Sequence, residues 1–215
     1  ECCYGLMEDY KVDRRGDVGS VVREKTMYCL LELVQKICTV KIEESTRQNY
    51  LSPQTLAKIV GCLLQQLVEK IDRMRLVAGS ILQTLFDSCA ATLPDFPQKL
   101  ELVSIFGGES LRERVKGDQS RIDVKFDISL VDTSFLDYAQ NENFVYFWNV
   151  PQCVFPLIMP LCAYESYTYF LLRGVSLSAG GITLSTHKEA VAAIINYIDT
   201  LDSADVASRA RVLDS

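Results

Sequence analysis

The stretch from Leu56 to Ile71, which reads LAKIVGCLLQQLVEKI, decides the fold. Its apolar side chains recur every three or four residues, which places them on one face of an α-helix. Ser52 and Pro53 mark the helix start, because a serine hydroxyl caps free N–H groups and proline at the first helical position has none to satisfy. So broad an apolar face predicts a helix buried among other helices. The face consists of Leu56, Ile59, Val60, Leu63, Leu64, Leu67, Val68 and Ile71.

The segments on both sides of this helix continue the helical pattern. Residues 20–41 are predicted to form an amphipathic helix, and a third helix is predicted to end before Pro94 and Pro97, since proline cannot continue a helix. The predicted buried positions are Leu30, Leu33, Val34 and Ile37 in the first of these helices and Val77, Ile81 and Leu85 in the second.

An acidic residue precedes an arginine by six positions twice, as Asp17 and Arg23 and as Glu69 and Arg75. In HEAT-type repeats an acid in the turn and an arginine at the start of the second helix let neighbouring hairpins share charge-assisted hydrogen bonds. The copies are 52 residues apart, more than the about 40–47 residues of such repeats, and we assign the excess to a loop at Glu43 to Tyr50. Because only two copies of this acid–arginine spacing occur, a chance match is the alternative explanation. We predict an all-α, HEAT- or armadillo-like α-solenoid of antiparallel helical hairpins.

The helical pattern stops between about residues 95 and 143. Alternating apolar positions from Ile122 to Leu130 are typical of a β-strand. We expect this strand either to pair with Lys99 to Ile105 as a local hairpin or to remain mobile, because an isolated strand has no partner for its backbone groups. The prediction is one helical domain over residues 1–215 that carries a non-helical insertion, an inserted flap or flexible loop, over residues 95–143. Capture of a partner by strand addition is the alternative role.

Helices are predicted to resume near Pro151. Gln152 to Ala163 should be short or kinked because it contains two prolines, and Tyr164 to Ser176 should form the next helix. Gly180 and Gly181 are expected to end that helix in left-handed conformations.

A last helix is predicted after Thr186, which stands three residues before Glu189 as in a reciprocal capping box. The tail after Asp202 is expected to fray. The predicted buried side of this helix is formed by Val191, Ile194, Ile195 and Ile198.

An aromatic cluster lies where the insertion returns to the helices. Large aromatic side chains there either close the core or anchor a protein partner, and we favour core closure. The cluster is Phe144, Tyr146, Phe147 and Trp148.

Composition excludes several function classes. A net charge of −6, from 22 basic and 28 acidic residues, argues against nucleic acid and anionic membrane as partners. There is no leader and no run of the ~20 apolar residues that a membrane crossing needs. We therefore expect a soluble, cytoplasmic protein. Because the sequence begins at Glu1 without methionine, we expect it to be a piece of a longer protein.

The eight cysteines do not form a metal-binding pattern. There is no CxxC motif and only one histidine, so no metal and no structural zinc are expected. Four cysteines fall in or at the ends of apolar helical stretches, where a free thiol packs as a small hydrophobe. These are Cys29, Cys38, Cys62 and Cys89.

Catalytic chemistry has little support in the sequence. A serine or cysteine nucleophile needs a neighbouring base, and the single imidazole, His187, is expected on a helix surface; a hydrolase would depend on it. There is no GxxxxGK[ST] loop for nucleotide phosphates. We expect a protein that is not an enzyme and has no catalytic residue and no cofactor.

The most unusual stretch is VDRRGDVG, residues 12–19, which predicts a tight hairpin turn with an aspartate as a candidate helix N-cap and two glycine positions. From Asp13 to Met27 the sequence DRRGDVGSVVREKTM is similar to the DRRGDVGSWVREAAM signature of the tubulin-folding cofactor D family, with Val21 in place of its tryptophan. Residues 69–75, EKIDRMR, resemble that family's EKIDRFR, and residues 171–183, LLRGVSLSAGGIT, resemble its LLGLVVSVGGLTEST. The matches keep the family's order and identify the C-terminal region of a member.

The resemblance implies a large α-solenoid that acts as a tubulin-folding cofactor. Such a chaperone binds β-tubulin, assembles or dismantles the tubulin heterodimer with cofactors C and E, binds an Arf-like small GTPase, and with its partners stimulates GTP hydrolysis by tubulin. It also implies a cytoplasmic, cytoskeleton-associated protein. The alternative is another HEAT-repeat scaffold, such as a transport receptor or phosphatase adaptor.

The candidate site is a partner-contact or repeat-turn motif. An exposed arginine in its turn is more often a solvated or salt-bridging residue than an arginine finger for the tubulin nucleotide. The candidate residues are Asp13, Arg14, Arg15, Gly16, Asp17, Arg23, Arg73 and Arg75.

Overall fold

The computed structural model describes residues 2–14, 16–107, 147–181 and 184–200. In this part of the chain the secondary structure is almost entirely helical, which confirms the predicted all-α class. The first half contains α1 (Cys2–Met7), β1 (Val12–Asp13), β2 (Gly16–Asp17), α2 (Gly19–Thr39), α3 (Glu44–Tyr50), α4 (Pro53–Leu67), α5 (Asp72–Cys89) and α6 (Lys99–Phe106). The second half contains α9 (Pro151–Ile158), the 3-10 helix η3 (Met159–Ala163), α10 (Glu165–Ala179) and α11 (Leu184–Thr200).

The helix that decides the fold, α4, begins where the sequence predicts. The hydroxyl of Ser52 accepts a hydrogen bond from the Thr55 N–H at 3.2 Å, and Pro53 occupies the first turn. All the predicted apolar positions are buried except Ile71, which is half-buried. The predicted core helix is therefore confirmed.

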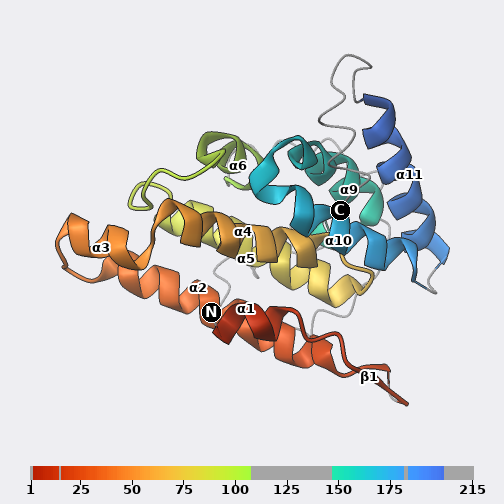
Figure 1. The fold of residues 1–215 in the computed structure, drawn as a ribbon, viewed down its shortest axis with the longest axis horizontal. Helices are drawn as coiled ribbons and strands as arrows, with labels where there is room; N and C mark the ends of the chain where they lie inside the picture. The colour runs from red at the N-terminus through yellow and green to blue at the C-terminus, as the bar shows by residue number, and fades with distance from the viewer. Residues whose placement is uncertain (1, 15, 108–146, 182–183, 201–215) are drawn as a thin grey trace.

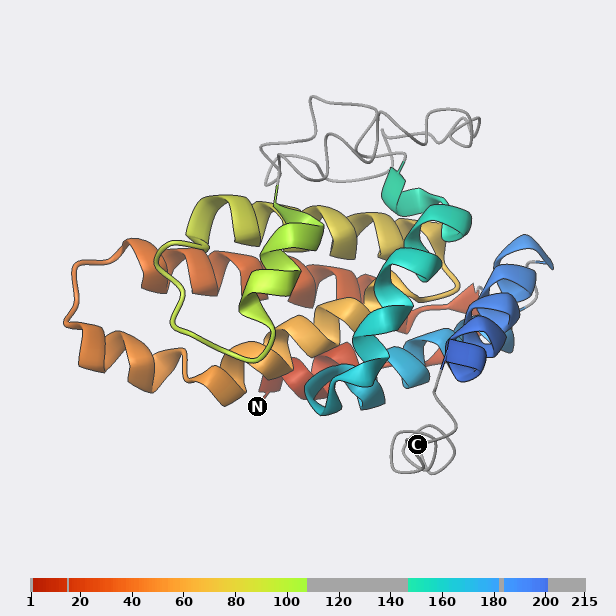
Figure 2. The same cartoon turned by 90° about the horizontal axis from the view of Figure 1, so that it is seen from above.

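The helices stack as neighbouring hairpins around α4 and α5 (Figures 1 and 2). Near their starts α2 and α5 are joined by the Glu24–Arg73 ion pair at 2.7 Å, and near their ends by a Gln35–Ser88 hydrogen bond at 3.3 Å, so the two helices run parallel. On the other side α10 runs parallel to α4, and the Ser178 hydroxyl donates to the Val68 carbonyl at 2.7 Å. Parallel packing of equivalent helices from successive hairpins is the arrangement of a HEAT-like solenoid.

Close approach of α10 to α4 requires glycine. A Cβ atom built on Gly174 would lie 2.3 Å from the Gln65 carbonyl oxygen, well inside van der Waals contact. The absence of a side chain at residue 174 therefore sets the distance between the two helices.

Two members of the aromatic cluster, Phe147 and Trp148, lie in the described part of the chain. Both close the core, which is the role that the sequence favoured. Phe147 and Trp148 are buried, and Trp148 packs against the ring of Phe106 with centroids 5.4 Å apart. A Cβ on Gly79 of α5 would lie 2.4 Å from the Trp148 ring, so the indole lies directly on that helix. Phe144 and Tyr146 lie outside the described residues.

Two predictions for loops and strands are wrong. Lys99 to Ile105, expected as a possible strand, belongs to helix α6, because burial of Leu102 and Phe106 one turn apart holds this segment helical. Glu43 to Tyr50, expected as a loop, contains the short helix α3. The predicted strand from Ile122 to Leu130 lies outside the described residues.

The proline-containing segment is short and kinked as predicted. Pro156 lies inside α9, which ends at Ile158, and the chain continues as η3 before α10 begins. Gly180 ends α10, but the predicted left-handed conformation is wrong, since its φ is −84°. A tightened last turn, in which the Gly181 N–H donates to the Ser178 carbonyl at 3.1 Å, satisfies the end of the helix instead.

The buried side predicted for α11 is wrong at two of its four positions; Val191 and Ile194 are half-buried, and Ile194 packs against the core. The helix begins at Leu184, so Thr186 lies inside it and is buried instead of capping its start. Ile195 and Ile198 are exposed. The buried side uses small and aromatic residues that let α11 approach its neighbours closely, and it consists of Thr186, Ala190, Ala193 and Tyr197.

The buried positions of α2 differ from the prediction at two residues. Leu33 is 49% exposed and Cys29 is exposed, so neither belongs to the core. Cys38, Cys62 and Cys89 are buried as expected. Among the described helices, none is long and apolar enough to span a membrane.

Candidate functional site

Residues 12–17 form a short β-hairpin, called here the turn hairpin, that projects beyond the start of α2 (Figure 1). Val12 pairs with Asp17 and Asp13 with Gly16 in antiparallel register, which leaves two residues for the turn. Gly16 has a φ of +105°, a conformation that residues with a Cβ rarely adopt. Asp13, Arg14 and Gly16 are exposed. Arg15 lies outside the described residues.

Asp17 joins the turn hairpin to α2. Its carboxylate accepts a hydrogen bond from the Ser20 N–H at 3.0 Å, and the Ser20 hydroxyl donates to the Asp17 carbonyl at 2.7 Å. Val18 is the N-cap of α2, so the predicted N-cap position of an aspartate is wrong, but Asp17 accepts a free N–H of the first helical turn from one residue further out.

The same carboxylate binds Arg23 through both of its oxygens. The guanidinium nitrogens of Arg23 lie 3.2 and 2.9 Å from the two Asp17 oxygens, and one of them also donates to the Asp9 carbonyl at 2.5 Å. The Arg23 side chain is completely buried. A bidentate pair of this kind fixes direction as well as distance, so it holds the base of the turn hairpin firmly on α2.

Three polar side chains complete the surroundings of Arg23. Its Nε donates to the Gln66 side-chain oxygen at 3.0 Å, and its guanidinium lies 4.0 Å from the centre of the Tyr10 ring. The Tyr10 hydroxyl in turn accepts hydrogen bonds from the side-chain amides of Gln65 and Gln66, both at 3.0 Å. Burial raises the pKa of Tyr10. Arg23 and the residues that contact it are called the arginine network below.

Glu69 brings the next hairpin into the arginine network. Its carboxylate lies 3.8 Å from Arg23 and accepts a hydrogen bond from the Ile71 N–H at 2.7 Å. Burial raises the pKa of Glu69, and the Ile71 N–H and the charge of Arg23 oppose this shift. Arg23 of one hairpin is thus shared with the turn of the next, which is the contact expected of a repeat ladder.

Arg75 makes a different set of contacts from Arg23. It donates to the Glu69 backbone carbonyl at 2.7 Å and to the Asn149 carbonyl at 3.0 Å, and it also pairs with Asp72. The Glu69 carboxylate itself faces Arg23 and the Ile71 N–H. Burial lowers the pKa of Arg75. Arg75 therefore extends the chain of contacts to the residues that precede α9.

The candidate residues divide into three groups. Asp17, Arg23 and Arg75 are connected through Glu69 in the interior. Arg73 is half-exposed beside this group, where it pairs with the buried Glu24. Asp13, Arg14 and Gly16 belong to the exposed turn hairpin.

Sequence reasoning missed several members of the arginine network. Gln65 and Gln66 carry a recognisable signal, since two adjacent amides interrupt an otherwise apolar helix and must find partners when buried. Asp9 and Asn149 contribute backbone carbonyls, which any residue type supplies, so no signal exists for them.

The described residues offer little for catalysis or metal binding. His187 lies in the first turns of α11, where Nδ1 contacts the Ala179 carbonyl at the end of α10. No group of three or more His, Cys, Asp or Glu side chains in the described ranges could hold a metal ion. In the described ranges the turn hairpin is exposed, and the Asp17–Arg23 pair fixes its base to α2.

Comparison with known proteins assigns the chain to a family. Residues 57–215 match the family model described as "Tubulin folding cofactor D C terminal". A protein of Dictyostelium discoideum named "Tubulin-specific chaperone D" is 25% identical over 213 residues, which cover 94% of this chain and 12% of that protein. The chain thus spans about 12% of the length of this curated relative. No solved structure matches. The family model matches most of this chain. The chain therefore belongs to the tubulin-folding cofactor D family and contains the C-terminal region of that family.

Proposed function

We propose that this chain is the C-terminal part of a tubulin-folding chaperone and that it binds β-tubulin, alone or within the tubulin heterodimer. Membership of the family and the name of the Dictyostelium relative support the chaperone role. The observation that carries a binding role for this chain is the turn hairpin, whose exposed polar tip rests on a buried and highly connected base.

Rigidity of the base is the physical reason to expect binding there. An exposed loop normally loses conformational freedom when it binds, and this loss weakens the complex. Here the bidentate Asp17–Arg23 pair and the capping of α2 fix the loop before a partner arrives. A hairpin held in this way can present its exposed Asp13 and Arg14 for directional hydrogen bonds to a protein surface at little entropic cost.

The proposed mechanism is conformational. Binding energy spread over the hairpin stack stabilises one state of the client relative to another. Companion cofactors C and E and an Arf-like GTPase are the proposed further partners, and stimulated GTP hydrolysis is proposed to occur on tubulin within that assembly. We place the protein in the cytoplasm in association with the cytoskeleton. We also propose that residues 1–215 form one helical domain and that residues 95–143, which include α6, form an insertion in it.

Equilibrium binding to purified αβ-tubulin tests the proposal. The triple variant Asp13→Ala, Arg14→Ala, Arg15→Ala should bind at least tenfold more weakly, since charge-assisted hydrogen bonds contribute about 1.5–3 kcal/mol each. Lys188→Ala is the control, because it removes an exposed charge from α11. Equal affinities for the two variants, with helical dichroism unchanged in both, would refute a role for the turn hairpin.

A further inference from the structure

A kinked segment packs against a regular helix where α9 and η3 meet α11 (Figures 1 and 2). Pro156 lies inside α9, and the chain continues as the 3-10 helix η3, which contains Pro160. Proline has no backbone N–H to donate, so this segment does not follow one straight helix axis. Because α11 is a continuous helix, the two elements cannot pack evenly along their whole length.

A hollow of about 480 Å³ lies between these elements and is called the α11 pocket below. Its α11 side includes Ala192 and Ala193, whose methyl groups leave the space open, and Met159 and Pro160 of η3 line the other side. Met159 and Ala193 are buried, whereas Pro160 is exposed, so the pocket has an apolar floor and opens to solvent. Its volume lies in the range of about 300–1,000 Å³ that is typical of binding pockets.

Three polar side chains of α11 line the pocket among these apolar groups, namely Glu189, Asn196 and Tyr197. Glu189 is half-buried, and it does not cap α11, since the helix begins at Leu184. No hydrogen bond or ion pair to another described residue engages the Glu189 carboxylate. The carboxylate is therefore available to a positively charged group that enters the pocket.

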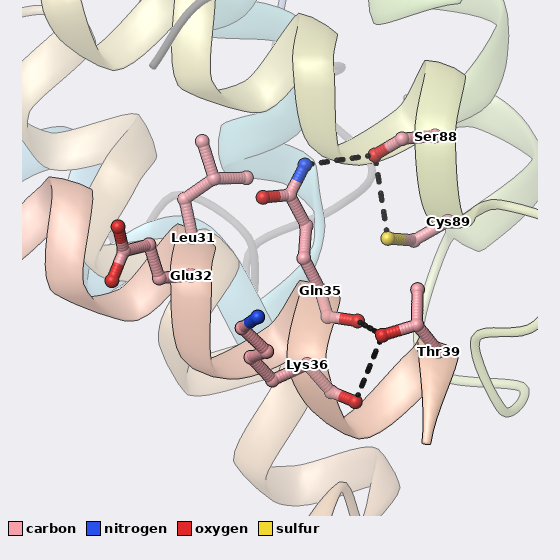
Figure 3. A pocket seen from close by; sticks show the side chains of 7 residues that line it. All are labelled: Leu31, Glu32, Gln35, Lys36, Thr39, Ser88 and Cys89. Carbon is pink, nitrogen blue, oxygen red and sulfur yellow. Dashed lines mark hydrogen bonds between the residues drawn. The ribbon is translucent and has the colours of Figure 1, made fainter. Parts of the chain in front are cut away.

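A second groove, between α2 and α5, has a similar volume of about 420 Å³ but a different charge (Figure 3). Its lining includes both Glu32 and Lys36, so a carboxylate and an ammonium group offset each other. Gln35 donates to the Ser88 hydroxyl across this groove at 3.3 Å, so these polar groups already bind each other. The described lining of the α11 pocket contains a carboxylate and no basic side chain. The α11 pocket is thus the one of the two that favours a cation.

We propose that the α11 pocket is a docking site for an arginine side chain that a partner protein presents between apolar residues. The planar guanidinium can bind both oxygens of the Glu189 carboxylate and donate a further N–H to the side-chain oxygen of Asn196. The Tyr197 ring offers an aromatic surface to the cation. The apolar stem of the arginine packs against Met159 and Pro160.

The size of the pocket explains why apolar residues should flank the arginine. The hollow is larger than one arginine side chain, and its walls are mostly apolar, so a neighbouring apolar residue of the partner can fill the remaining space. Buried arginine and apolar anchors of this kind contribute much of the affinity of protein interfaces. The α11 pocket shares no residue with the turn hairpin, so this proposal does not depend on the proposed tubulin contact.

Fluorescence anisotropy with a synthetic peptide tests the proposal. The probe is a fluorescein-labelled peptide with leucine, arginine and leucine at its centre and alanine at both ends. The comparison peptide carries citrulline, which keeps the shape of arginine without its charge. The arginine peptide should bind the 215-residue chain saturably, and the citrulline peptide about tenfold more weakly, because it cannot form a charge-assisted pair. Equal affinities, or no saturable binding of the arginine peptide, would overturn the proposal.

Two variants locate the binding in the α11 pocket. Glu189→Gln should weaken binding of the arginine peptide about tenfold and leave that of the citrulline peptide unchanged. Ala192→Phe should block both peptides at an unchanged melting temperature, because the new ring fills the hollow.

Glu32→Gln is the matched control, since it removes a carboxylate from the α2–α5 groove (Figure 3) and should bind the arginine peptide as the wild type does. An equal loss in Glu32→Gln and Glu189→Gln would assign the binding to the overall negative charge of the chain and overturn the proposal. A wild-type dimer in sedimentation that Glu189→Gln dissociates would assign the pocket to a second copy of this chain, which would also overturn it.

Discussion

Arg23 of α2 and Glu69 of the α4–α5 turn lie 3.8 Å apart in the protein interior, although they belong to different hairpins. Asp17 binds the same guanidinium at 2.9 Å. One arginine therefore fixes the turn hairpin to its own helix and that helix to the next hairpin. The position of the proposed binding surface and the stacking of the solenoid depend on the same side chain.

Replacement of Arg23 by methionine should destabilise the protein by about 3–5 kcal/mol, because removal of one partner leaves buried carboxylates without their counter-charge. Urea unfolding followed by helical dichroism measures the change. Lys188→Met, which replaces an exposed lysine of α11 in the same way, should stay within about 0.5 kcal/mol of the wild type. If both variants lose a similar amount of unfolding free energy, the arginine network stabilises the protein no more than an exposed lysine does.

Glu69→Gln should reveal a pH-dependent cost of the buried carboxylate. The pKa of Glu69 is raised above its ordinary value of 4.5, so its favourable contribution is complete below that pH and is lost as the pH rises through the folded-state pKa. The pKa of Glu69 is lowered by the charges of Arg23 and Lys70 and raised by the charge of Asp17.

The free energy of unfolding, measured in urea between pH 4 and pH 8, should therefore fall for the wild type relative to Glu69→Gln as the pH increases. Glutamine keeps an oxygen that can accept from the Ile71 N–H, so this backbone contact is preserved. Two curves that stay parallel over the whole range would show that Glu69 has an unshifted pKa.

Gly174→Ala should destabilise the α4–α10 contact by about 1–3 kcal/mol, because the new methyl group would overlap the Gln65 carbonyl oxygen and force the helices apart. Gly180→Ala is a close control on the same helix end, since its nearest neighbour would be 3.6 Å away and its φ of −84° suits alanine. The two melting temperatures test this directly. A Gly174→Ala protein as stable as Gly180→Ala would contradict the close packing of α10 on α4.

The sequence was sufficient for features that depend on local chemistry. Helix α4 has a marked start and a regular apolar face, so its position and buried side follow from pattern alone. The six-residue spacing of Asp17 and Arg23 likewise predicts a contact of the HEAT-repeat type, and the structure brings both residues into the arginine network.

Features that depend on tertiary packing could not be predicted from pattern. Helix α6 is held by contacts of Phe106 with Phe86 and Trp148, which are distant in sequence. In α11 the residues with the largest apolar side chains include the exposed Ile195, whereas Ala190 and Ala193 face the core because their small size allows close approach. Arg75 binds backbone carbonyl groups, and no pattern of side chains in the sequence predicts these contacts.

Hydrogen exchange of this chain, with and without purified αβ-tubulin, tests most directly whether the turn hairpin binds tubulin. Amides of residues 11–17 should exchange more slowly in the complex, while those of α4, already buried in the free protein, should be unchanged. Tubulin binding that protects other surfaces and leaves residues 11–17 as fast as in the free chain would contradict the proposed contact.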